Sequence, residues 1–228
     1  MAADADYFDH LNQDLLERLP PASRRVLDIG CGSGALARAY RLRNPGADYT
    51  GVELDPGAAK RALAHCSRVA QADVEGAACL EALERLGRAA PWDLLVFGDV
   101  LEHLRDPLRV LAMLRQWASP GAACVACIPN VGHVSLVHQL LRARWDYQDD
   151  GLLDRTHLRF FTQPTMLALF RQAGWTVHEC TARVLEPEAT DRAIAPLLTL
   201  APALGLDPQA MHLHLSAYQW IVRASNPG

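Results

Sequence analysis

Apolar residues form short runs that alternate with stretches of helical character. The runs that begin at Val26 and that cover 47–53, 68–72, 91–98 and 122–128 predict five strands. The fourth run is continuously apolar over 94–97, which is typical of a strand covered on both faces. Asp55-Pro56 and Asp106-Pro107 each place an N-cap before a proline at the first helical position. This alternation predicts an α/β fold, a doubly wound and mostly parallel sheet with helices on both faces.

Both ends of the chain add further elements. Apolar residues at 8, 11, 15, 16 and 19 predict a helix over 7–19 that Pro20 ends. Tyr7 and His10 are expected to pack against the protein, with closure over a ligand as the alternative. Thr162 begins another helix that ends at Gly174. Strands over 175–184 and 213–224 are expected to flank an insertion at 185–209 that packs as one or two helices.

Composition narrows the class of protein. A chain of 228 residues, half of them apolar, predicts one domain over 1–228. A formal net charge of −4 argues against a nucleic-acid partner. The chain has no secretory signal and no membrane-spanning run, so a cytoplasmic protein with reduced cysteines and no membrane partner is expected. Cys124 and Cys127 are expected on opposite faces of one buried strand, as core residues and not as a metal or redox pair.

The glycine-rich turn after the first strand is the strongest candidate for a ligand site. Gly30, Cys31, Gly32 and Gly34 lead into a helix, whose first N–H groups face whatever lies on the turn. The same spacing also satisfies the dinucleotide fingerprint, with Glu53 at the ribose position. Asp28 would repel a pyrophosphate but attract a ligand that carries an ammonium and a sulfonium.

With Asp28, these residues resemble motif I of the class I S-adenosylmethionine-dependent methyltransferases. The resemblance covers about residues 11–182 and the last strand, and it implies a seven-stranded Rossmann-like sheet whose last strand runs antiparallel between the fifth and sixth. It also implies that Glu53 and Leu54 bind the ribose and that Asp73 and Val74 bind the adenine. Gly98, Asp99, Val100 and His103 are then expected at the methionine end. Asp73 also suits a helix cap.

A metal site is a separate alternative. Asp99, Glu102 and His103 resemble the acid-x-x-Glu-His set that binds a divalent metal in ubiquinone-pathway O-methyltransferases. Leu-Glu-His also occurs across the superfamily without a metal, so the primary expectation is a site with none.

Two segments, about 130–162 and 185–212, are expected to cover the substrate. Histidine is the natural general base near neutral pH, and His157 is preferred over His133, with Asp154 beside it. His157 and Asp154 would equally serve to lock the loop. The expected substrate contacts are Asn130, Trp145, Tyr147, Arg155 and Arg159. The two arginines suit an anionic group on the substrate or the acids at 149, 150 and 154.

The resemblance implies an S-adenosylmethionine-dependent enzyme that releases S-adenosylhomocysteine. The expected reaction is O-methylation of a small-molecule or sugar-containing metabolite of a biosynthetic or natural-product pathway. Two alternatives stay open. One is a MetW-like accessory protein that binds the cofactor and assists a partner enzyme, which the segment at 129–134 resembles. The other is an NAD-dependent oxidoreductase. The sequence leaves monomer and homodimer undecided.

Overall fold

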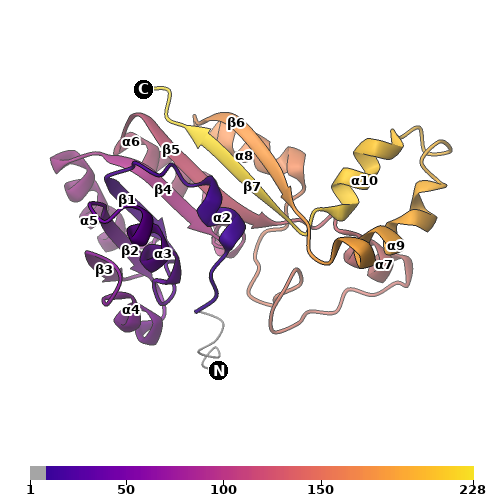
Figure 1. The fold of residues 1–228 in the computed structure, drawn as a ribbon, viewed down its shortest axis with the longest axis horizontal. Helices are drawn as coiled ribbons and strands as arrows, with labels where there is room; N and C mark the ends of the chain where they lie inside the picture. The colour runs from indigo at the N-terminus through magenta and orange to yellow at the C-terminus, as the bar shows by residue number, and fades with distance from the viewer. Residues whose placement is uncertain (1–8) are drawn as a thin grey trace.

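A seven-stranded sheet forms the centre of the molecule (Figure 1). The computed structural model describes residues 9–228. The strand order is β3-β2-β1-β4-β5-β7-β6, with β7 antiparallel to both of its neighbours and the other pairs parallel, as the methyltransferase resemblance predicts. The strands are β1 Arg25–Ile29, β2 Asp48–Glu53, β3 Arg68–Gln71, β4 Trp92–Gly98, β5 Ala118–Pro129, β6 Thr176–Arg183 and β7 Gln219–Ser225.

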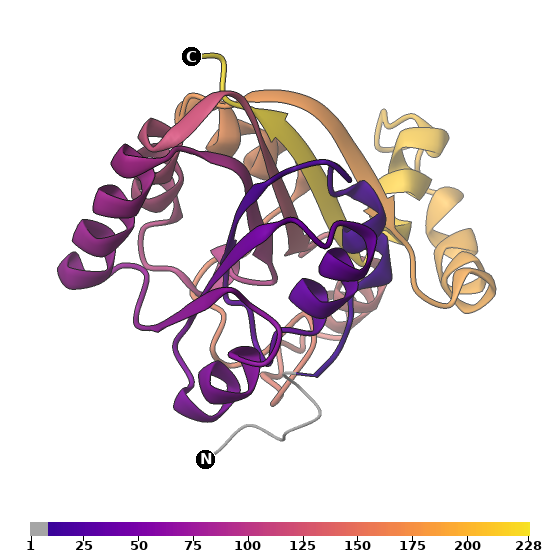
Figure 2. The ribbon, with the colours of Figure 1, turned by 60° about the vertical axis from the view of Figure 1, so that its left-hand side comes forward.

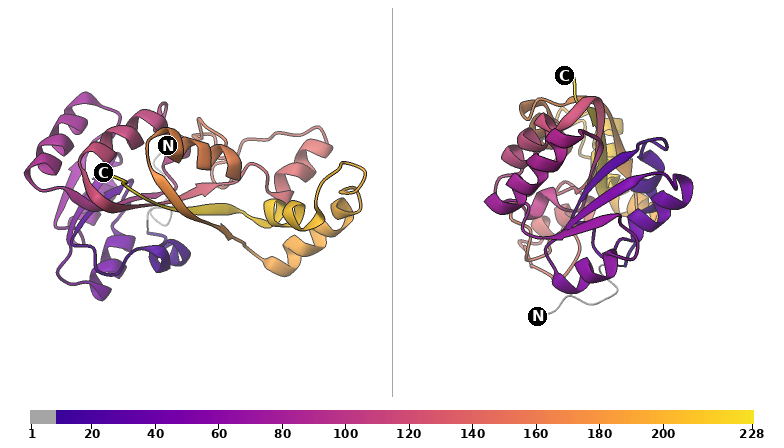
Figure 3. Two further views of the ribbon diagram at one scale, coloured as in Figure 1. Left: turned by 90° about the horizontal axis from the view of Figure 1, so that it is seen from above. Right: turned by 90° about the vertical axis from the view of Figure 1, so that its left-hand side faces the viewer.

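Helices cover both faces of the sheet, as the view from above shows (Figure 3). One core joins the sheet to α5, α6 and α8, and the other joins it to α2, α3 and α4. These helices are α2 Gln13–Arg18, α3 Ala35–Arg43, α4 Pro56–Ala62, α5 Ala77–Ala89, α6 Pro107–Gln116 and α8 Gln163–Gln172. Cys124 belongs to the first core and Cys127 to the second, which confirms that they lie on opposite faces of β5.

Three further helices project from one end of the sheet (Figures 1 and 2). They are α7 Val134–Leu141, α9 Pro187–Leu198 and α10 Pro208–Ser216. Val134, Ile194, Leu197 and Leu215 form a small core of their own between these helices. The insertion is therefore helical, as expected.

The predicted start of the last strand at Leu213 is wrong. Residues 211–215 alternate apolar residues with histidines, which imitates the period of a strand. They lie instead in α10, which Asp207 caps by accepting a hydrogen bond from the Ala210 N–H at 2.9 Å. The strand begins six residues later, at Gln219.

Smaller differences concern element ends. The first helix described, α2, starts at Gln13 with Asn12 as N-cap, and the predicted position of Tyr7 lies outside the described residues. Strand β5 starts four residues before the predicted Ala122. The predicted caps at Asp55, Asp106 and Thr162 are confirmed. Among residues 9–228, no helix is long and apolar enough to cross a membrane.

Candidate functional site

A cavity of about 1030 Å³ opens where β1, β2 and β4 end. It is lined by every residue predicted to bind the cofactor except Gly34, which caps α3 behind the turn: Asp28, Gly30, Cys31, Gly32, Glu53, Leu54, Asp73, Val74, Gly98, Asp99, Val100 and His103. The carboxyl ends of parallel strands meet at this edge, so residues that are distant in sequence converge there.

The glycine-rich turn requires glycine because of its backbone. Gly30, Gly32 and Gly34 have φ of 70°, 54° and 85°, in the left-handed region. A Cβ on Gly30 would also lie 2.3 Å from Cγ2 of Val100. The Gly30 N–H donates to the Val52 carbonyl at 2.8 Å, which fixes the turn beside β2. This turn leaves space for a ligand and presents backbone N–H groups to it.

Asp28 lies beneath the turn and is 2% exposed. Its Oδ2 accepts a hydrogen bond from the Tyr49 hydroxyl at 2.9 Å. Burial raises the pKa of Asp28 to about 7, although the Tyr49 hydrogen bond lowers it, and the nearby Glu53 charge adds to the rise. A cationic ligand in the cavity would favour the ionised form.

Glu53 is held rigidly at the end of β2. Its Oε2 accepts from the Gly32 N–H at 2.8 Å, and its Oε1 accepts from the Asp55 N–H at 2.9 Å. A carboxylate has lone pairs left after these two bonds. It is therefore oriented and still able to accept ribose hydroxyls.

Asp73 lies in the turn before α5 and lines the cavity, whereas the N-cap of that helix is Gly76, so the cap suggested by the sequence is wrong. Its Oδ1 accepts from the Glu75 N–H at 2.8 Å, and its Oδ2 pairs with Arg105 at 3.1 Å. Arg105 also pairs with Glu75, and Arg105 and Glu75 line the cavity as well. Ion pairs and hydrogen bonds therefore fix the polar side chains on this side of the cavity.

A second cavity, of about 140 Å³, adjoins the first. Asp99 and His103 line both cavities. The smaller one is also lined by Glu102, Pro129, Gly151, Leu152, Asp154, His157, Tyr218 and Gln219. It thus brings together the predicted base His157, its expected neighbour Asp154 and the metal candidates.

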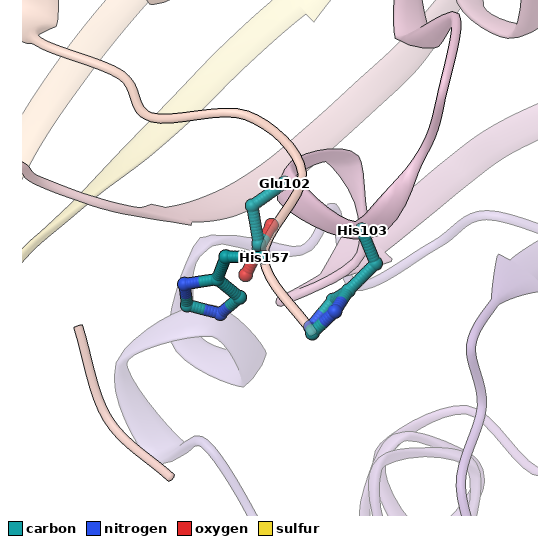
Figure 4. Close-up of side chains that lie close together, drawn as sticks. All are labelled: Glu102, His103 and His157. Atoms are coloured by element: carbon teal, nitrogen blue, oxygen red, sulfur yellow. The ribbon is translucent and has the colours of Figure 1, made fainter. Parts of the chain in front are cut away.

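The segment that carries His157 is held against the short 3₁₀ helix η1, Leu101–His103. The N–H groups of Leu158 and Arg159 donate to the Glu102 carbonyl at 2.8 and 3.0 Å. The His103 and His157 rings lie edge to face with centroids 4.8 Å apart (Figure 4). Residues more than fifty positions apart therefore share one site.

The hydrogen bonds of the two histidines indicate their tautomers. Nδ1 of His157 lies 3.2 Å from the Leu152 carbonyl, and Nδ1 of His103 lies 3.3 Å from the Thr156 carbonyl. Because a carbonyl only accepts, each Nδ1 carries the proton and each Nε2 keeps a lone pair. Burial lowers the pKa of both rings, and so favours the neutral form.

The Asp154 side chain is linked by hydrogen bonds to His103 and not to His157. Its Oδ1 accepts from the Thr156 hydroxyl at 2.7 Å, and that hydroxyl lies 3.1 Å from Nδ1 of His103. His157 meets Asp154 through the backbone, where its N–H donates to the Asp154 carbonyl at 3.0 Å. The carboxylate therefore locks the loop and orients the other histidine.

Glu102 is the most unusual side chain of the site. It is 1% exposed, and neither carboxyl oxygen has a hydrogen-bond partner within residues 9–228. Burial raises its pKa well above the usual value, and the charge of Asp99 adds to this. Ligand atoms of Glu102, His103 and His157 all lie within 4.8 Å of one another (Figure 4). The group that the structure brings together thus contains His157 where the sequence predicted Asp99.

Asn130, a predicted substrate contact, and His133, the second candidate base, are both buried by other parts of the protein. Asn130 is 2% exposed, and its amide donates to the carbonyls of His214 and Ala217 at 2.8 and 2.7 Å. His133 caps α7 through Ser135 and packs edge to face on Tyr218. Burial lowers the pKa of His133 to about 4. Neither residue lines the two cavities.

The other predicted contacts also lie outside both cavities. Trp145 packs on Phe160 with ring centroids 5.3 Å apart, and Tyr147 is 49% exposed. Arg155 pairs with Asp149 at 2.8 Å, and Arg159 donates to the Arg105 carbonyl. Both arginines are thus engaged within the protein, as the alternative from the sequence allowed for Arg155.

Thr156, Leu158 and Gln219 are among the lining residues that the sequence analysis did not predict. Thr156 and Leu158 line the large cavity, and Gln219 lines the small one. Thr156 and Leu158 lie in the segment that the sequence predicts to cover the substrate. Their position beside Arg155, His157 and Arg159 was the sequence signal that could have identified them. The sequence analysis placed Gln219 in the middle of a strand predicted to start at Leu213. The correct start would have shown that Gln219 is the first residue of the strand, at the edge of the sheet where the site lies.

Comparison with known proteins agrees with this geometry. The family model described as a methyltransferase domain matches residues 4–180. The chain belongs to the class I S-adenosylmethionine-dependent methyltransferase family. S-adenosylmethionine is accordingly the cofactor, and the NAD alternative is set aside. The residues that the sequence predicts to bind it line the large cavity.

Methyltransferases related in sequence share most of the chain. A ubiquinone biosynthesis O-methyltransferase of Psychrobacter arcticus is 31% identical over 166 residues, which cover 68% of this chain and 60% of that protein. Its counterpart from Xylella fastidiosa is 28% identical, with 86% and 79% covered. The match to the first relative thus spans less than two thirds of that protein.

Solved methyltransferases share the fold. A SAM-dependent methyltransferase from Archaeoglobus fulgidus superposes with a TM-score of 0.62 at 17% identity, covering 96% of each chain. This likeness confirms the Rossmann-like methyltransferase fold.

Proposed function

We propose that this methyltransferase transfers the methyl group of S-adenosylmethionine to a hydroxyl of a small-molecule or sugar-containing acceptor. The observation that carries the proposal is the small cavity at the Asp99 end of the cofactor cavity, with a neutral His157 in its wall. Methyl transfer from a sulfonium is an in-line displacement. Holding acceptor and methyl in line contributes about 7 to 11 kcal/mol.

His157 is the proposed general base. Its Nδ1 proton is engaged with the Leu152 carbonyl, so the lone pair on Nε2 is the one that accepts a proton. Burial lowers the pKa of the ring, which keeps it unprotonated near neutral pH. As the acceptor oxygen attacks the methyl, its proton passes to Nε2 and the sulfonium becomes a neutral thioether.

The acidic lining of the small cavity disfavours an acceptor whose reacting part is an anion. Asp99, Glu102 and Asp154 line it, and no lysine or arginine does so among the described residues. Arg155 and Arg159 are engaged elsewhere. At about 140 Å³ the cavity has room for one ring, and a larger acceptor would extend beyond it. The names of the relatives support oxygen as the methylated atom.

A screen with methyl-labelled cofactor tests the reaction. Phenols, catechols and sugars are offered beside amines and carboxylic acids, and label transfer is detected by mass spectrometry. We expect transfer to a hydroxyl-bearing acceptor. Transfer to amines or carboxylates alone would contradict the proposal.

Replacement of His157 tests the base. The His157→Ala variant is expected to lower turnover by about 10²- to 10⁴-fold, because the acceptor proton then has no positioned acceptor. Affinity for S-adenosylhomocysteine, measured by calorimetry, is expected to stay near that of the wild type. His178→Ala, an exposed histidine on β6, is the matched control. Unchanged turnover in the His157 variant would remove this residue from the mechanism.

A divalent cation is a second candidate, favoured by the buried and unpartnered carboxyl of Glu102. Glu102, His103 and His157 would hold it, as a carboxylate and two imidazoles of a kind that bind transition metals. Ligands at about 2.1 Å from an ion lie at most about 4.2 Å apart, so small side-chain rotations would have to close the set. A bound cation would lower the pKa of an acceptor hydroxyl.

Calorimetry with Mn²⁺ separates the two candidates. If the cation is used, the wild type binds Mn²⁺, Glu102→Gln loses binding, and the exposed Glu17→Gln on α2 does not. Activity is then lost to a chelator and restored by the ion. No Mn²⁺ binding together with full activity in chelator would leave His157 as a base alone.

A further inference from the structure

Asp99 occupies the boundary between the two cavities and has an unusual backbone. It lines both of them, and its φ is 55°, in the region that non-glycine residues seldom adopt. Its N–H donates to the Cys127 carbonyl at 3.1 Å. Strained conformations persist where surrounding contacts fix them, and they concentrate at functional sites.

A chain of polar side chains fixes the Asp99 carboxylate from behind. Nε2 of Gln219 donates to Oδ1 of Asp99, and Nη1 of Arg183 donates to Oε1 of Gln219. Nε of Arg183 in turn donates to Oδ2 of Asp14 on α2 at 3.0 Å. A guanidinium only donates and a carboxylate only accepts. The amide of Gln219 therefore fits between them in one orientation.

Strand direction brings these residues to the site. Gln219 is the first residue of β7 and pairs in register with Arg183, the last residue of β6. On its other side Gln219 pairs with Pro129, the last residue of β5. Because β7 runs antiparallel to β5, its beginning lies at the edge where the parallel strands end. Gln219 is 6% exposed, so its amide is committed to this network.

The other carboxylates of the cavity have different partners. Both oxygens of Glu53 accept backbone N–H groups, and Asp73 accepts the Glu75 N–H and pairs with Arg105. These two lie at the end assigned to ribose and adenine. Asp99 lies at the opposite end, beside the small cavity where the methyl has to be delivered.

We propose that Gln219 and Arg183 are positioning residues, which hold the Asp99 carboxylate so that it receives the ammonium group of the cofactor's methionine part. The inference depends on the cofactor and not on the acceptor. Fixing the ammonium fixes the direction of the neighbouring sulfonium methyl. Arg183 acts through Gln219 and does not touch the cofactor itself.

Two nucleosides test this by calorimetry. S-adenosylhomocysteine carries the amino-acid part, and 5′-methylthioadenosine lacks it. Gln219→Met and Arg183→Met are expected to weaken the binding of S-adenosylhomocysteine about tenfold. A loss of this size corresponds to one charge-assisted hydrogen bond that is no longer well placed. Affinity for methylthioadenosine is expected to change less than about twofold, because this nucleoside has no ammonium group for Asp99 to bind. Arg183→Lys is expected to recover part of the loss.

Two controls separate positioning from general damage. Arg223→Met removes an arginine from β7 that pairs with Glu179 on the surface, and both affinities are expected to stay unchanged. In an Asp99→Asn background, Gln219→Met is expected to add no further loss. Equal weakening of both nucleosides, or unchanged affinity for both, in the Gln219→Met or Arg183→Met variants would overturn the proposal.

Discussion

At the scale of single residues, Asp28 is a buried carboxyl that the sequence predicts to attract the cofactor. Its carboxyl is 2% exposed and bonded to Tyr49, and its pKa is raised to about 7, chiefly by burial. A folded-state pKa above the unfolded value means that the folded state binds this proton more tightly. The stability that this proton contributes is complete below about pH 4 and is lost as the pH rises through about 7.

Asp28→Asn is expected to remove that dependence. The amide oxygen still accepts from Tyr49, and no charge is buried at high pH. We compare the free energies of unfolding of the variant and the wild type, both without cofactor. The difference in favour of the variant is expected to grow by about 2 to 3 kcal/mol from pH 5 to pH 8. Urea unfolding at the two pH values measures this. An equal difference in stability at both values would contradict the raised pKa.

The segment around His157 shows what single residues reveal in a sequence and what they do not. The sequence predicts that residues of about 130–162 cover the substrate, and the lining of the small cavity includes Asp154 and His157 from this segment. The partner of Asp154 could not be predicted, because a long segment with little regular structure has no period that fixes its contacts. Arg155 and Arg159 suited an anionic group on the substrate, but the sequence does not show which side chains pair within a loop.

At the scale of elements, the turn between β1 and α3 packs against the residues that follow the neighbouring parallel strand β4. Gly30 faces Val100, which follows β4, so two strand ends meet without room for a Cβ. The alternation of strand and helix made this edge predictable, because all parallel strands end there. The last strand was misplaced, since the alternating residues 211–215 imitate β structure while Asp207 starts a helix.

Gly30→Ala tests this close approach. The methyl group meets Cγ2 of Val100 and the backbone keeps a φ of 70°, so we expect a loss of about 2 to 5 kcal/mol and of cofactor binding. Gly46→Ala is the control, because a Cβ there meets no atom within 4 Å. Its stability is expected within about 0.5 kcal/mol of the wild type. Thermal unfolding compares them, and equal losses would contradict the explanation.

At the scale of the whole molecule, a sheet with two covered faces carries a helical projection with its own small core. The large cavity draws its lining from the turns after β1, β2, β3 and β4, from the N-terminal segment, and from Thr156 and Leu158. A ligand that fills it therefore contacts parts that are far apart in sequence. Binding is expected to stabilise the described fold as a unit.

Thermal unfolding measures that coupling. S-adenosylhomocysteine at about 100 times its dissociation constant is expected to add about 2.7 kcal/mol, which raises Tm by about 5 to 10 °C for a chain of this size. NAD at the same concentration is expected to leave Tm unchanged, because Asp28 disfavours a pyrophosphate there. A larger shift with NAD would contradict the assignment of the cavity.

The position of β7 between β5 and β6 has a consequence for synthesis of the protein. Strands β5 and β6 have no direct pairing and wait for residues 219–225 to join them. On the ribosome, β1 to β4 emerge early, whereas Gln219 emerges more than one hundred residues after Asp99. Long-range pairing of this kind is slow to form. The nascent chain thus exposes an incomplete cofactor pocket until its final strand is in place.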